Sequence, residues 1–113
     1  MLTIEGLQGL GVNTQEGLNR CLNNEGFYFR LISQVMRDDS FERLRDALER
    51  GNLDEAFSLA HNLKGSLGNL SLTPIYEPIV QMTELLRNRT AMDYSALMDE
   101  VMKQKEAIAV LCE

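Results

Sequence analysis

The chain has 113 residues, enough for one domain over residues 1–113, and a formal net charge of −6 from 17 acidic and 11 basic residues. This balance disfavours nucleic acid as the main partner, because phosphate binding needs clustered lysine and arginine, and two prolines with 6% aromatic residues disfavour a turn-rich β-sandwich. The longest apolar runs are too short to span a membrane and the first residues lack the pattern of a secretory signal, so we expect a cytoplasmic protein.

The first half of the chain predicts short helices separated by breaks. Glycines interrupt residues 2–12, which we expect to form a short helical piece or an irregular arm. Thr14 is expected to cap a short helix, whose apolar positions are Leu18, Cys21 and Leu22. Asn24 is expected to cap the next helix, whose apolar stripe is Tyr28, Leu31, Ile32, Val35 and Met36. The pattern slackens at residues 38–40 and then resumes, so residues 25–50 form either one long bent helix or two helices.

The second half of the chain predicts three further helices. Their expected boundaries are a stop at Gly51, an N-cap at Asn52, a turn over residues 70–74, a loop over residues 87–93 and an N-cap at Asp93. Pro78 is expected in the first turn of the middle helix or at a kink, because it has no backbone N–H. Short connections make consecutive helices antiparallel neighbours. We therefore expect an all-α protein, an antiparallel up-down four-helix bundle with an extra short N-terminal helix.

The only histidine, His61, is expected in the middle of the helix that Asn52 caps. At about 100° per residue, the apolar residues of this helix form one buried stripe, made of Leu53, Ala56, Ala60, Leu63, Leu67 and Leu70. His61 lies outside the stripe, on a face shared with Lys64, Gly65 and Gly68. Two glycines inside a helix cost about 2 kcal/mol in propensity. They either end the helix or leave space for a partner at the imidazole, and the stripe, which stays in phase to Leu70, favours the second explanation.

An exposed imidazole beside a lysine favours phosphoryl transfer over hydrolysis. A histidine side chain at neutral pH is mostly uncharged and keeps a nucleophilic lone pair. A hydrolase would need an Asp or Ser oriented on the ring and a substrate pocket. Phosphoryl transfer needs mainly positioning and stabilisation of negative charge, and Lys64 can supply a positive charge. On this account, alanine at Gly68 should preserve or raise stability, whereas a bulky residue there should slow transfer.

Cysteine and histidine usage predicts neither a disulfide scaffold nor a metal site. Cys21 and Cys112 lie far apart in sequence and are expected to be free thiols, although a disulfide between them stays open. One histidine, without a Cys-x-x-Cys or His-x-x-x-His spacing, disfavours a transition-metal site. We therefore expect no metal and no cofactor in this chain.

The segment HNLKGS (residues 61–66), followed by Gly68, resembles the signature of histidine-containing phosphotransfer (HPt) domains, H-x-x-K-G-[AS] with a small residue just after. The segments GLNRCLNNEGFYFRLI (17–32) and LERGNLDEAFSLAHNLKG (48–65) also resemble the usual HPt sequence before the histidine. The resemblance implies a four-helix bundle with an exposed histidine in the middle of a helix. Two positions depart from the family: many members have a glycine where this chain has Ser71, and Pro78 is unusual in the following helix.

The resemblance also implies a function in two-component signalling. His61 would be the phosphoryl acceptor, taking the group from a receiver-domain aspartate and passing it to another receiver; Lys64 would stabilise the phosphoryl charge, and Gly65 and Gly68 would give partners access. The implied partners are response-regulator receivers, which carry the magnesium ion, and a sensor or hybrid histidine kinase. No ATP-binding motif is present, so we expect a monomeric phosphocarrier without kinase activity of its own.

Two alternative functions stay open at this stage. One is a chemotaxis-kinase-type phosphotransfer domain that an ATP-dependent histidine kinase phosphorylates. The other is a helical docking module that uses the His61 face without chemistry. The sequence also leaves open whether the domain is free-standing or part of a hybrid kinase.

Overall fold

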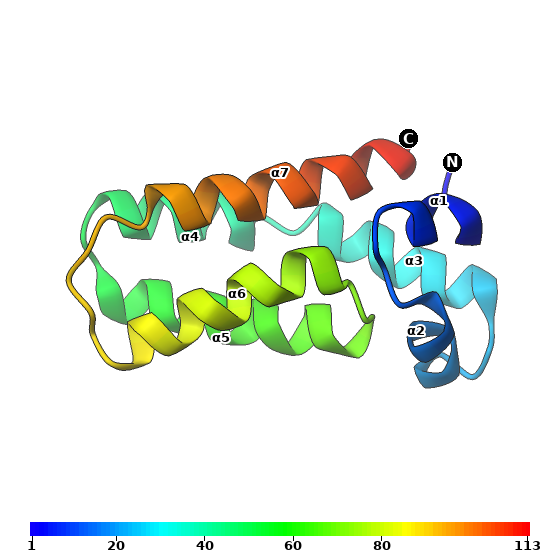
Figure 1. Cartoon of the computed structure of the whole chain (residues 1–113), viewed down its shortest axis with the longest axis horizontal. Coiled ribbons are helices and arrows are strands. Elements are labelled where there is room, and N and C mark those ends of the chain that lie inside the picture. Colours follow the sequence, from blue (N-terminus) through cyan, green and yellow to red (C-terminus); the bar gives the residue numbers. More distant parts are fainter.

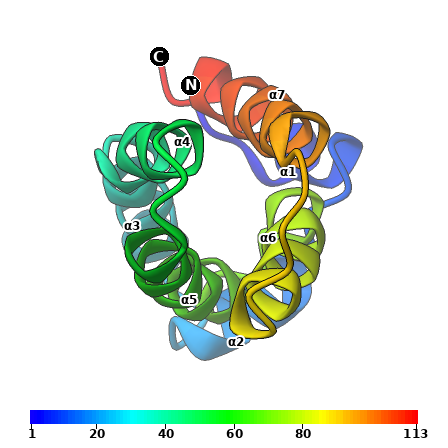
Figure 2. The ribbon, with the colours of Figure 1, turned by 90° about the vertical axis from the view of Figure 1, so that its left-hand side faces the viewer.

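The computed structural model describes residues 1–113 as seven helices without a strand (Figure 1). The helices are α1 (Ile4–Gly9), α2 (Thr14–Arg20), α3 (Glu25–Met36), α4 (Ser40–Glu49), α5 (Leu53–Asn69), α6 (Thr73–Arg87) and α7 (Ser95–Leu111). Helices α4 to α7 run side by side, and the end view in Figure 2 shows them in a ring. Helices α1 and α2 lie at one end of this bundle, beside α3.

The predicted all-α bundle is confirmed, and the structure resolves the arrangement that the sequence left open. Residues 25–50 form two helices, α3 and α4, rather than one. The carboxylate of Asp38 accepts a hydrogen bond from the backbone N–H of Ser40 (2.8 Å), the first residue of α4; hydrogen bonding from Ser40 lowers the pKa of Asp38. Two short helices, α1 and α2, stand where one extra N-terminal helix was expected.

A single apolar core of 25 buried residues joins the helices. Helix α5 packs between α4 and α6, and the buried residues it contributes are Ala56, Leu59, Ala60, Leu63 and Leu67. Leu70, just after the helix, is buried too, whereas Leu53 is only half-buried. The apolar stripe predicted from the spacing therefore faces the core, and the opposite face of α5 points outwards.

The C-terminal end of α5 is held by a buried tyrosine from α3. The Tyr28 hydroxyl donates a hydrogen bond to the backbone carbonyl of Leu70 (2.8 Å), and the Tyr28 side chain is completely buried. Burial raises the pKa of Tyr28 to about 12. Gly17 on α2 packs directly against the Tyr28 ring, where any side chain would collide with it. These contacts connect the short helices to the helix that carries His61.

The turn between α5 and α6 explains the departure at Ser71. The Leu72 N–H donates to the Leu67 carbonyl (3.0 Å) and the Ser71 N–H donates to the Gly68 carbonyl (3.1 Å), the two bonds of a Schellman motif. In this motif the residue after the C-cap is left-handed, and Ser71 has φ +54°. Glycine adopts this conformation without strain. The Ser71 hydroxyl instead donates to the Glu16 carboxylate (2.8 Å), a bond that glycine cannot make.

Two helix starts lie one residue away from their predicted positions. Thr14 is the first residue of α2 rather than its cap, and the Asn13 side chain accepts the capping hydrogen bond. Ser95 begins α7 with Tyr94 as its N-cap residue, while the Asp93 carboxylate accepts the Ser95 N–H (2.8 Å). The predicted caps Asn24 and Asn52 are confirmed, each with a side-chain hydrogen bond into the first turn.

One other prediction was wrong for a conformational reason, and one alternative for Pro78 is excluded. Leu22 is 88% exposed instead of buried, because α2 ends at Arg20 and both Leu22 and Asn23 adopt left-handed conformations. This turn directs the Leu22 side chain away from the core. Pro78 lies in the second turn of α6 rather than in its first, and the helix continues past it to Arg87; the alternative of a kink at Pro78 stays a prediction.

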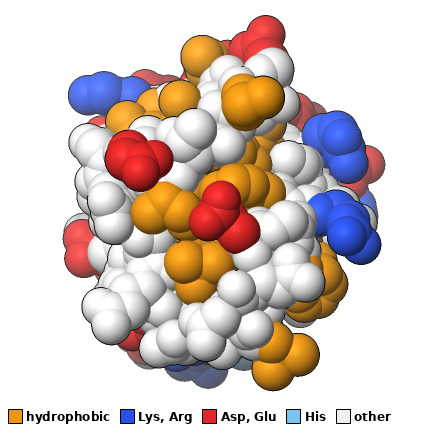
Figure 3. Space-filling view, turned by 90° about the vertical axis from the view of Figure 1, so that its right-hand side faces the viewer, with side chains coloured by type: hydrophobic (Ala, Val, Ile, Leu, Met, Phe, Trp, Pro, Cys, Tyr) orange, Lys and Arg blue, Asp and Glu red, His pale blue; other side chains and the backbone are white.

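Apolar side chains gather at the end of the molecule where α1 and the C-terminus meet (Figure 3). Met1, Leu2, Phe29 and Cys112 contribute to a shallow hollow there of about 430 Å³. Both cysteines are free thiols, and Cys21 is buried. No helix is long and apolar enough to cross a bilayer.

Candidate functional site

His61 lies at the centre of α5, eight residues after Leu53 and eight before Asn69. Its side chain is exposed, whereas those of Ala60 and Leu63 are buried. The helix continues through both glycines to Asn69, so the alternative in which they end the helix is wrong. The imidazole is therefore presented to solvent in the middle of a continuous helix, as the spacing predicts.

The imidazole of His61 is stacked on the ring of Phe57, one helical turn earlier. The two ring centroids are 5.7 Å apart and the planes are inclined by 23°, a separation typical of aromatic pairs. The guanidinium of Arg87, on α6, lies 5.3 Å from the centroid of the Phe57 ring. The i,i+4 spacing places Phe57 and His61 on one helix face, but the contact between the two rings was not predicted.

No side-chain hydrogen bond or ion pair of the chain involves a ring nitrogen of His61. A triad-like arrangement, in which an acid orients the imidazole, is therefore not formed. No group of three or more His, Cys, Asp or Glu side chains is placed to hold a metal ion. The site therefore presents an exposed imidazole without hydrogen-bond partners at the centre of a continuous helix.

Lys64 is the only cationic residue of α5, and it is half-buried one turn after His61. It forms no ion pair, whereas the arginines that border this face are each paired with an acid. The pairs are Arg20 with Glu16 (3.3 Å), Arg87 with Glu84 (3.4 Å) and Arg89 with Asp54. On this face, the Lys64 ammonium therefore differs from the arginines, because no carboxylate neutralises its charge.

The two glycines of α5 have different surroundings. A Cβ on Gly65 would meet no atom within 4 Å, so this position is open. A Cβ on Gly68 would stand 3.0 Å from Cε1 of Tyr76, and Gly68 is half-buried. The sequence predicts open space at both positions, but Gly68 also lets the Tyr76 ring of α6 approach α5 closely. The expectation that alanine at Gly68 is harmless overlooks this ring.

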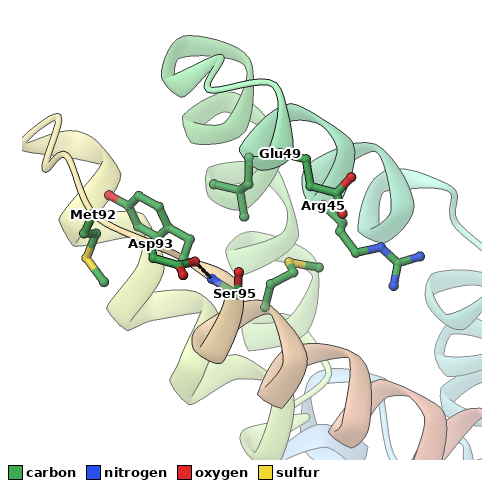
Figure 4. A pocket seen from close by; sticks show the side chains of 8 residues that line it. Arg45, Glu49, Met92, Asp93 and Ser95 are labelled. Atoms are coloured by element: carbon green, nitrogen blue, oxygen red, sulfur yellow. Dashed lines mark hydrogen bonds between the residues drawn. The ribbon is translucent and has the colours of Figure 1, made fainter.

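Shallow hollows flank His61 along the α5–α6 seam. One, of about 320 Å³, lies beside Phe57, Arg87 and Arg89; the other, of about 280 Å³, lies beside Gly68 and Tyr76. A separate hollow of about 290 Å³ lies between α4 and the start of α7 and includes no residue of α5. Figure 4 shows this separate hollow, with Asp93 bonded to the Ser95 N–H and Arg45 and Glu49 on the facing helix.

The comparisons with known proteins identify a family. The family model described as "Hpt domain" matches residues 34–111. This segment includes α4 to α7 completely and contains His61, Lys64, Gly65 and Gly68. Searches of curated proteins and of solved structures gave no significant match.

Proposed function

The chain belongs to the family of Hpt domains, and we propose that His61 is the residue on which it carries a phosphoryl group. The family implies histidine phosphotransfer in phosphorelay signalling. The observation that supports the assignment to His61 is its position: an exposed imidazole, free of protein hydrogen bonds, at the centre of α5 inside the matched segment. It is also the only histidine in the chain.

The proposed reaction joins an imidazole nitrogen to phosphorus. A ring-nitrogen lone pair attacks the aspartyl phosphate of a receiver domain; the N–P bond forms, the P–O bond to the aspartate breaks, and the carboxylate leaves as an anion. The second ring nitrogen keeps or releases its proton to water. The same steps in reverse pass the group to a second receiver. Because little covalent chemistry is required of the protein, its task is positioning and charge stabilisation.

The residues around His61 support this task. Lys64 would place a compact positive charge near the transferred phosphoryl oxygens, and no carboxylate of the chain neutralises that charge. Gly65 would let the receiver backbone approach the imidazole, since nothing in the chain lies against that position. Gly65→Gln is therefore expected to slow transfer to and from a receiver while leaving the fold intact.

We propose response-regulator receivers, with magnesium bound on the receiver, and a sensor or hybrid histidine kinase as the partners. The chain would act in the cytoplasm as a monomeric phosphocarrier. Because the domain contains no nucleotide-binding motif, the phosphoryl group would reach it from another protein.

A comparison of phosphoryl donors tests this function. The protein is mixed with a phosphorylated receiver and, separately, with ATP and a histidine kinase. Label that appears from the receiver, and is lost in acid but kept in base, supports a phosphorelay carrier. Label that appears only with ATP and a kinase would support the chemotaxis-type alternative. Unaltered signalling by His61→Gln, with retained partner binding, would support a docking module.

A further inference from the structure

Phe57 packs against the edge of the core and also contacts the imidazole of His61. Phe57 belongs to the outward face of α5 rather than to its buried stripe, and its side chain is only half-buried. The ring stacks on the imidazole with a centroid separation of 5.7 Å. An aliphatic side chain would cover the neighbouring core equally well but would offer no planar surface to the imidazole.

The Phe57 ring is in turn contacted by Arg87 of the next helix, α6, and we call this contact the brace. The Arg87 guanidinium lies 5.3 Å from the Phe57 ring centroid, a cation–π arrangement. Arg87 Nε is in turn 3.4 Å from the carboxylate of Glu84, one turn earlier on α6. A chain of contacts thus runs from α6 through Arg87 and Phe57 to the imidazole of His61.

An exposed histidine on a helix otherwise exchanges freely between rotamers. His61 makes no hydrogen bond that would select one of them. We propose that Phe57, braced by Arg87, is a positioning residue that holds the imidazole in one orientation for in-line attack on phosphorus. This inference rests on the proposed function, in which His61 is the attacking group. In-line phosphoryl transfer depends on alignment of the attacking and leaving atoms, so a freely rotating ring reacts more slowly in the docked complex.

The chain offers a matched control for this pair. Phe27 on α3 also carries an arginine over its ring, with the Arg30 guanidinium 5.9 Å from the centroid. Phe27 is 37% exposed and has no histidine beside it. Phe57→Leu and Phe27→Leu therefore remove the same kind of ring from the same kind of arginine, and only the first removes a contact with His61.

The test combines transfer kinetics with nuclear magnetic resonance. With one phosphorylated receiver, Phe57→Leu is expected to lower the transfer rate at saturating receiver about fivefold, equivalent to about 1 kcal/mol, without changing the half-saturating receiver concentration. Phe57→Tyr, which keeps the ring, should restore the rate, and Phe27→Leu should leave it unchanged. Because His61 is the only histidine, its imidazole proton signals are unambiguous, and they should lose an upfield ring-current shift in Phe57→Leu alone.

A second phosphoryl donor, phosphoramidate, distinguishes an effect on the orientation of the His61 imidazole from an effect on its intrinsic nucleophilicity. This small donor transfers its phosphoryl group to an imidazole nitrogen with loss of ammonia and needs no docked partner. Phe57→Leu should react with phosphoramidate at the wild-type rate, because the intrinsic reactivity of the ring is unchanged. This inference would be overturned if the wild-type protein accepts the phosphoryl group from the receiver and Phe57→Leu accepts it at the same rate. It would also be overturned if the imidazole proton shifts are the same in Phe57→Leu and in the wild type. Neither result would contradict the proposed function. A wild-type protein that takes no phosphoryl group from any receiver would overturn the proposed function itself.

Discussion

The ring of Tyr76 on α6 lies over Gly68 on α5, so close that a Cβ on Gly68 would stand 3.0 Å from Cε1 of the ring. The Gly68 carbonyl also accepts a hydrogen bond from Arg20. Gly68 therefore stabilises the seam between α5, α6 and the N-terminal helices, in addition to any role in access to His61. Gly65 has no such neighbour, and this difference can be measured.

Alanine at the two glycines should have unequal effects on stability. Gly65→Ala is expected to increase the free energy of unfolding by about 1 kcal/mol, because it improves helix propensity at an open position. Gly68→Ala should gain less or lose stability, because the Tyr76 ring must move. Urea unfolding of both variants checks the difference.

A double-mutant cycle identifies the cause of this difference. In a Tyr76→Ala background the ring is gone, and Gly68→Ala should then stabilise about as much as Gly65→Ala does. If Gly68→Ala has the same effect with and without Tyr76, the close approach of the ring is not what requires glycine there.

Ser71 gives a second test of stability, at the left-handed position after α5. Ser71→Ala keeps the left-handed φ of +54° but loses the hydrogen bond to Glu16, and should lower the free energy of unfolding by about 1 kcal/mol. Ser71→Gly loses the same bond but removes a backbone strain of about 1–2 kcal/mol, so it should be less destabilising than Ser71→Ala. Equal losses in denaturant unfolding would contradict this account of the turn.

Most of the bundle could be predicted because the sequence patterns that indicate it, capping residues and helical spacing, involve residues that are close together in the chain. Asn24 and Asn52 could be predicted as caps because capping depends on a side chain and the next three residues. The buried stripe of α5 follows from its helical spacing alone. His61 is exposed for the same reason, since the same spacing places it outside that stripe.

The features that could not be predicted depend on distant contacts or unusual backbone angles. Periodicity places Leu22 on an apolar face, but it contains no information about the left-handed turn that exposes it. The approach of Tyr76 to Gly68 depends on how α5 and α6 pack. The stack of Phe57 on His61 is different, because its i,i+4 spacing was visible in the sequence; only the brace from Arg87 required the structure.

Stability should fall at high pH because of Tyr28. Its pKa is about 12 in the folded protein, raised from 10.0 by burial. Above pH 10 the unfolded chain releases this proton while the folded protein still retains it, so ionisation favours unfolding. The contribution of neutral Tyr28 is complete below pH 10 and is lost between about pH 10 and pH 12, by about 2–3 kcal/mol at most.

Tyrosinate absorbance and unfolding measurements check this prediction. One of the three tyrosines should titrate near pH 12, and this step should be missing in Tyr28→Phe. The pH dependence of unfolding between pH 10 and 12 should be weaker in that variant as well. A Tyr28 that ionises near pH 10 in the folded protein would contradict the account.

Lys64 should assist transfer without being essential. Lys64→Ala is expected to lower the transfer rate from a receiver about tenfold, equivalent to about 1.4 kcal/mol. The loss is limited because the metal ion on the receiver also neutralises the phosphoryl group and because water and salt screen a partly exposed ammonium. Lys64→Arg, which keeps the charge, should recover part of the rate in the same assay. A complete loss of transfer in Lys64→Ala would show that the ammonium does more than stabilise charge.

The most direct measurement is phosphoryl transfer from one phosphorylated receiver to the wild-type protein and to His61→Gln, with the folded state of both verified by their unfolding curves. His61→Gln replaces an exposed side chain, so the variant should fold like the wild type. The account predicts acid-labile, base-stable label on the wild-type protein and none on His61→Gln. Label that persists on folded His61→Gln would place the acceptor on another residue and contradict the assignment.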